Sequence, residues 1–206
     1  MARNPYQPLE LEPEDIVRAT DDELRELLRG FDVGERDDRV RRLRDVNRIL
    51  VAGPGDGYWH SGGEEASWVL SEAKDAYIYG MPIASLFASH AACERRLAGI
   101  VASRRRPPSG SDQWGLGRLT GWAGNEGWLP RGFAERLERI AARRKVLGHY
   151  RNVSSKDSFV RRAIAQADNA GRFEVDVPGT LEADALDALA TAYDLYAEIG
   201  ARDFFV

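Results

Sequence analysis

Hydrophobic and polar positions alternate with helical periodicity along nearly the whole chain. Apolar residues recur every three or four positions, and glycine or proline interrupts the repeat between segments. The pattern predicts helices over residues 13–29, 35–51, 64–79, 83–103, 113–123, 131–147, 155–168 and 181–199. We therefore expect an all-α helical bundle.

Three regions differ in their local signals. Residues 1–60 form an N-terminal helical extension, in which the sequence from Thr20 to Glu23 is typical of a helix capping box. Residues 64–168 form the helical bundle itself. In residues 169–206, an alternating segment at 171–178 favours an extended conformation, and the helix that follows is expected to pack on the bundle.

Composition restricts the class of protein. A chain of 206 residues can bury a substantial core, and its net charge of -4 argues against a surface that is positive everywhere. The single cysteine, Cys93, excludes an internal disulfide framework and a multi-cysteine metal site. The first residues lack the apolar stretch of a signal peptide, and the uncharged run from Ala76 to Cys93 is interrupted by Gly80 and Pro82. We expect a cytoplasmic protein that does not insert into a membrane.

The clearest amphipathic helix, 131–147, carries a charge on its core-facing row. The row contains Phe133, Leu137 and Ile140, then Arg144, and then Leu147. An arginine on such a row either extends outward to water or pairs with an acceptor, because an unpaired buried charge is too costly.

The helix 83–103 has a similar anomaly. His90 and Glu94 lie one turn apart on its core-facing side, with Cys93 beside them. We expect Arg144 to pair with Glu94 or with another acceptor of this helix. His90 by itself is better explained as a hydrogen-bonded core histidine. One histidine, one carboxylate and one thiol are too few for a metal site, so we expect no metal and no cofactor.

His149 follows Gly148, at the expected end of the 131–147 helix. On a continuous helix, Arg144 and His149 would point about 140° apart. They can act on one ligand only if the helix breaks at Gly148 or if a second subunit supplies one of them. The sequence leaves both routes open.

The surroundings of these two residues are strongly basic. Residues 131–162 contain ten basic side chains and only three acidic ones. This excess fits a local phosphate-binding surface. Counter-charges elsewhere explain it nearly as well, and candidates near the end of the chain are Glu182, Asp184, Asp187, Asp194 and Glu198.

These residues resemble the HEPN superfamily, the higher eukaryote and prokaryote nucleotide-binding fold. The resemblance covers residues 64–168. It rests on the helix segment Ala91–Leu97, the glycine-bearing segment Trp114–Leu119, and a final helix in which an arginine precedes a histidine by a short gap. Arg144 with His149 fits that gap, and so does Arg143 with His149. Lys145 departs from the pattern, because members of the family often have a polar, uncharged or acidic residue after the arginine.

The resemblance implies a metal-independent endoribonuclease that acts as a homodimer, of the kind found as toxins or phage-defence effectors. RNA would be the substrate, and an antitoxin or another defence protein would be a partner. Arg144 and His149 would be catalytic, because arginine can neutralise phosphate charge and histidine can move a proton. Supporting or alternative residues are Arg143, Lys145, Glu94, Tyr150 and Arg151. The alternative function is a non-catalytic helical module that dimerises or binds a nucleotide or a protein.

Overall fold

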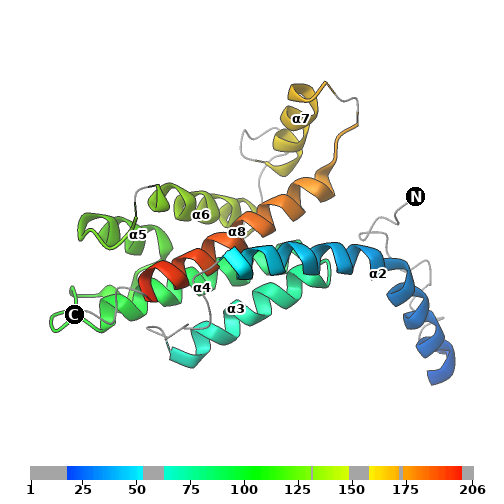
Figure 1. The fold of residues 1–206 in the computed structure, drawn as a ribbon, viewed down its shortest axis with the longest axis horizontal. Helices are drawn as coiled ribbons and strands as arrows, with labels where there is room; N and C mark the ends of the chain where they lie inside the picture. The colour runs from blue at the N-terminus through cyan, green and yellow to red at the C-terminus, as the bar shows by residue number, and fades with distance from the viewer. Residues whose placement is uncertain (1–17, 53–62, 131, 149–157, 172–173, 201–206) are drawn as a thin grey trace.

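The computed structural model describes residues 18–52, 63–130, 132–148, 158–171 and 174–200, which form helices joined by turns, without a strand (Figure 1). The predicted all-α class is confirmed. The described elements are α2 (Asp21–Ala52), α3 (Gly63–Ile78), α4 (Pro82–Ala102), the short 3-10 helix η1 (Ser111–Gln113), α5 (Leu116–Asn125), α6 (Phe133–Gly148), α7 (Phe159–Asn169) and α8 (Val177–Gly200).

Helices α4 and α8 form the centre of the molecule (Figure 1). Helix α3 packs against both of them, while α5 and α6 pack against α4. Three fully buried alanines of α8, Ala185, Ala188 and Ala192, recur at helical spacing. Their small side chains allow a close approach of neighbouring helices, and larger residues such as Leu97 and Leu189 fill the space around them.

Helix α2 is longer than the sequence pattern predicted. One helix runs from Asp21 to Ala52, through Gly30 and Gly34, where we expected a break between two helices. A glycine inside a helix costs only about 1 kcal/mol relative to alanine, so two isolated glycines do not end it. Figure 1 shows that the helix bends and that its N-terminal part projects away from the bundle.

The predicted capping box at the start of α2 is confirmed. The backbone N–H of Thr20 donates to the Glu23 carboxylate over 2.8 Å, and the backbone N–H of Glu23 donates to the Thr20 hydroxyl over 3.3 Å. Each side chain thus satisfies a backbone donor that the first helical turn leaves free.

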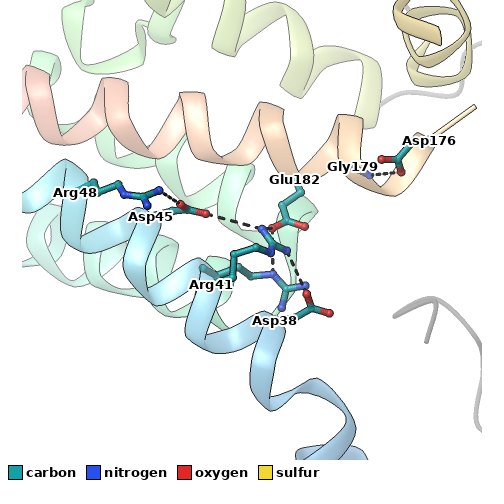
Figure 2. A network of polar contacts seen from close by, with 8 residues as sticks. Asp38, Arg41, Asp45, Arg48, Asp176, Gly179 and Glu182 are labelled. Atoms are coloured by element: carbon teal, nitrogen blue, oxygen red, sulfur yellow. Dashed lines mark hydrogen bonds and ion pairs between the residues drawn. The ribbon is translucent and has the colours of Figure 1, made fainter. Parts of the chain in front are cut away.

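A polar network fastens the C-terminal part of α2 to α8 (Figure 2). Glu182 of α8 accepts hydrogen bonds from Arg41 over 2.6 Å and from Arg42 over 3.3 Å. Burial would raise the pKa of Glu182, but the hydrogen bonds and charges of the two arginines outweigh burial and lower this pKa below its ordinary value.

The guanidinium of Arg42 lies so close to Gly80, which has a φ of 75°, that a Cβ there would be 2.7 Å from Nη1. The positive φ favours glycine at this position, and a larger residue would also force the Arg42 guanidinium to shift.

The described residues of the 171–178 segment do not form the predicted extended piece. Helix α8 already begins at Val177, and the Asp176 carboxylate accepts a hydrogen bond from the backbone N–H of Gly179 over 2.8 Å (Figure 2). Asp176 caps the helix and Pro178 fits its first turn. These two helix-start signals outweigh the alternating apolar residues that had suggested an extended segment.

None of the described helices is both long enough and apolar enough to cross a lipid bilayer.

Candidate functional site

The last turn of α6 emerges from the core. Phe133, Leu137 and Ile140 are buried, as their helical row predicted, whereas Arg144 and Leu147 are only partly buried. Arg144 therefore reaches solvent with part of its side chain and does not need a buried counter-ion.

The guanidinium of Arg144 packs on an aromatic ring of α4. Its central carbon lies 5.4 Å from the centre of the Phe87 ring, within the range of a cation–π contact. The same carbon would lie 3.9 Å from a Cβ placed on Gly148, so the charged group is folded toward the end of α6. In the described part of the chain, Arg144 forms no ion pair with a carboxylate, and the expected pair with Glu94 is absent.

Glu94 has a different partner. Its Oε2 accepts a hydrogen bond from the backbone N–H of Leu116 over 2.8 Å, at the first residue of α5. A Cβ on the preceding residue, Gly115, would lie 3.6 Å from the same oxygen. A carboxylate at a helix N-terminus satisfies a free donor and interacts favourably with the helix dipole. Glu94 therefore holds the start of α5 against α4.

His90 lies within electrostatic range of both Glu94 and Arg144; by itself the sequence favoured a hydrogen-bonded core histidine, while its place one turn from Glu94 suggested a polar centre shared between the helices. Burial lowers the pKa of its imidazole below the ordinary value of 6.5, the charge of Glu94 opposes this shift, and the charge of Arg144 adds to it. The imidazole is therefore neutral at pH 7. Its spacing of four residues from Glu94 was the signal that could have placed His90 in the site.

The structure separates the two candidate arginines of α6. The Nε of Arg143 lies 3.0 Å from Asp184, and its Nη1 lies 2.6 Å from Asp187, so Arg143 is engaged by two carboxylates of α8. Arg144 is its neighbour in sequence but faces α4. Lys145 is exposed and forms no ion pair with the described residues.

Helix α8 supplies carboxylates to several of the described basic residues of the 131–162 region. Arg136 of α6 forms an ion pair with Asp194 over 2.6 Å. Arg162 of α7 binds Asp184 through two hydrogen bonds, one of them 2.9 Å long. Of the two explanations that the sequence left open, the counter-charges of the C-terminal helix account for these arginines.

Three of the predicted site residues, His149, Tyr150 and Arg151, lie outside the described residues. Gly148, which directly precedes His149 in the sequence, is described, and it lies next to the guanidinium of Arg144. The structure thus places Arg144 and Glu94 within electrostatic range of His90, and it leaves Arg143 at the α8 interface.

The cysteine and the possible metal ligands are the other reactive groups that the sequence raised. Cys93 is fully buried, and burial raises the pKa of its thiol to about 12, so the nucleophilic thiolate does not form near neutral pH. Among the described residues, no group of three or more histidine, cysteine, aspartate and glutamate side chains is arranged to hold a metal ion.

No protein-family model, curated protein or solved structure matches the chain.

Proposed function

We propose that the protein is a metal-independent endoribonuclease of the HEPN type, in which Arg144 binds the scissile phosphate and His149 transfers the proton. The observation that carries this proposal is the state of Arg144. It is a partly buried guanidinium at the end of α6 whose N–H donors are not taken by any carboxylate of the described residues. Its neighbour Arg143 has its donors occupied by α8.

The chemistry requires few groups. The 2′-oxygen forms a new bond to phosphorus, the bond to the 5′-oxygen breaks, His149 accepts the 2′-proton, and solvent returns a proton to the 5′-oxygen. Arg144 neutralises the charge that builds on the phosphate oxygens in the transition state. The products are a 2′,3′-cyclic phosphate and a 5′-hydroxyl.

The neutral His90 next to Arg144 supports this assignment. An uncharged imidazole does not neutralise Arg144 or form an ion pair with it, as a carboxylate in this place would. Glu94 is held at the N-terminus of α5, so its carboxylate is occupied by Leu116. Arg144 therefore remains available to an external anion.

A homodimer belongs to the proposal. Arg144 and His149 would lie about 140° apart on one continuous helix, and a second subunit can supply the missing group. A sedimentation measurement at tens of micromolar tests this part, with a dimer as the expected result.

A second function has one observation in its favour. The cation–π contact of Arg144 with Phe87 is a structural role that requires no ligand. If this contact is its only role, the protein is a non-catalytic helical module that dimerises or binds a nucleotide or a protein.

Cleavage of RNA separates the two functions. Purified protein is incubated with mixed RNA in the presence of a chelator, beside His149→Ala and, as a control at an exposed basic residue of α2 outside the site, Arg36→Ala. We expect His149→Ala to lose cleavage by about 10²–10⁴-fold with an unchanged melting temperature, and the products of the wild type to carry cyclic phosphate ends. Equal cleavage by wild type and His149→Ala, or no cleavage at all, would contradict the nuclease and favour the binding module.

A further inference from the structure

Four arginines without carboxylate partners lie close together in the sequence, in a region that the proposed reaction does not use. In the described part of the chain, three arginines that follow α4 and one arginine of α5 form no ion pair, namely Arg104, Arg105, Arg106 and Arg118. Residues 104–130 contain only two acids, Asp112 and Glu126. This stretch therefore has a charge of +2 (four arginines less two acids) in a chain whose net charge is -4.

Two of these arginines are held on indole rings. The guanidinium carbon of Arg118 lies 4.3 Å from the ring centre of Trp114, and that of Arg104 lies 3.8 Å from Trp128 and 5.9 Å from Trp122. Arg118 and Trp122 are four residues apart on α5 and so share one of its faces, and Trp114 lies just before the helix, where its ring contacts Arg118. We call these five residues the α5 row. A ring contact leaves the positive charge and the N–H donors of an arginine available, which an ion pair does not.

Helix α5 also carries three exposed glycines. Gly117, Gly121 and Gly124 are exposed, none has a positive φ, and a Cβ on any of them would meet nothing within 4 Å. Neither the backbone conformation nor internal packing therefore requires glycine at these positions. Each glycine weakens a ten-residue helix relative to alanine, and each allows a ligand to approach the backbone closely.

One end of the α5 row reaches the proposed site. Trp114 directly precedes Gly115 and Leu116, which contact Glu94 beside His90 and Arg144. From there α5 extends ten residues, about 15 Å, to the other end of the row at Arg104 and Trp128.

We infer that the α5 row binds single-stranded RNA and leads it to Arg144. Trp114, Trp122 and Trp128 are partly buried against the core, so the groups offered to a strand are the guanidinium groups that these rings hold. Exposed bases stack on guanidinium planes, and arginines without carboxylate partners contact the phosphates. Duplex RNA keeps its bases paired and stacked inside the helix, so its bases cannot stack on the guanidinium planes. Single-stranded RNA would then be the substrate class of the proposed nuclease, and cleavage of the bound strand rests on that proposed function.

Binding is measured separately from cleavage. The probe is a labelled single-stranded oligonucleotide of roughly 12 nucleotides, within the range that single-strand binding folds cover, with 2′-O-methyl groups that prevent attack by the 2′-oxygen. Fluorescence anisotropy compares the wild type with Arg104→Gln/Arg118→Gln. The matched control is Arg36→Gln/Arg44→Gln, which removes the same charge from two exposed arginines of α2 that form no ion pair with the described residues.

We expect the α5 variant to bind about tenfold more weakly or worse, and the α2 control to bind like the wild type. Equal binding by both variants, or an equal loss in both, would contradict the inference, because it would mean that only the total charge matters. An affinity for duplex RNA equal to that for the single strand would contradict it as well.

A second pair of variants tests whether RNA approaches the backbone of α5 closely, and it changes no charge. Gly117→Ala/Gly121→Ala meets no steric obstacle and should raise the melting temperature, because alanine favours the helix. The control Gly30→Ala/Gly34→Ala changes two equally unhindered glycines of α2. We expect both pairs to gain stability, and only the α5 pair to bind the oligonucleotide more weakly. Unchanged binding by the α5 pair would contradict a close contact with the helix backbone.

The outcomes for this inference and for the nuclease differ. If His149→Ala abolishes cleavage of RNA but Arg104→Gln/Arg118→Gln binds and cleaves like the wild type, the nuclease stands and the α5 row is not the RNA-binding surface. If the oligonucleotide binds along the α5 row but no RNA is cleaved, the inference stands and the nuclease fails.

Discussion

Arginine has two different roles in two regions of this molecule. At the interface of α8 with α6 and α7, three arginines bind three aspartates of α8, through the pairs Arg136–Asp194, Arg143–Asp187 and Arg162–Asp184. Along the α5 row, Arg104 and Arg118 contact tryptophan rings and form no ion pair with the described residues. Both regions appear basic in the sequence.

The comparison shows that a basic stretch of sequence is not the same as a basic surface. A carboxylate cancels the charge of a guanidinium and occupies its hydrogen-bond donors. An aromatic ring fixes the position of the guanidinium and leaves both its charge and its donors for a ligand. Arg144, which packs on Phe87, belongs with the α5 row in this respect, although α6 also carries Arg143.

The largest expected change in the free energy of unfolding comes from the interface of α8 with α6 and α7. Asp184 is buried and binds both Arg143 and Arg162. Asp184→Asn removes the negative charge that both guanidinium groups share, and we expect a loss of about 3 kcal/mol in the free energy of unfolding, measured by urea denaturation. A matched change in the other region, Arg104→Gln/Arg118→Gln, should cost less than about 0.5 kcal/mol.

An equal loss of stability in both variants would contradict the comparison. It would mean that the arginines of the α5 row are as important for the fold as those at the α8 interface.

A smaller effect is expected at Glu94. If Glu94 formed a buried ion pair with Arg144, removing its side chain would lower the free energy of unfolding by about 3 kcal/mol. The structure instead gives Glu94 one hydrogen bond from the Leu116 N–H, as a helix-capping residue would have, so Glu94→Ala should cost about 1 kcal/mol. Glu94→Gln keeps an oxygen acceptor and should cost less than Glu94→Ala. Thermal unfolding of the two variants measures the difference, and equal losses would show that the charge alone is important.

The smallest effect is a dependence of stability on pH at His90. Because its pKa in the folded protein lies below the ordinary value of 6.5, the unfolded chain binds a proton more readily than the folded one. Stability should therefore decrease as the pH falls from about 6.5 toward the folded pKa, and should be unaffected by this group well above that range. Chemical unfolding at several pH values compares the wild type with His90→Gln, which cannot titrate. A decrease of the same size in both proteins would assign the pH dependence to other groups.

The sequence by itself determined the features that depend on neighbours three or four residues apart. The helical periodicity gave the all-α class, Thr20 and Glu23 gave the capping box, and the row from Phe133 to Ile140 gave the buried face of α6. These signals are local, because one helical turn brings such residues together in any fold. Gly30 was misleading for the same reason, since a local helix-weakening signal does not end a helix that continues on both sides.

Only the tertiary structure decided which charges meet. Arg143 and Arg144 are adjacent in the sequence, yet one faces the aspartates of α8 and the other faces Phe87 of α4. Arg104 and Trp128 are separated by 24 positions, and no periodicity within a helix relates them. Successive residues of a helix point about 100° apart, so the packing of the surrounding helices, and not the sequence near an arginine, decides whether it meets a carboxylate or a ring.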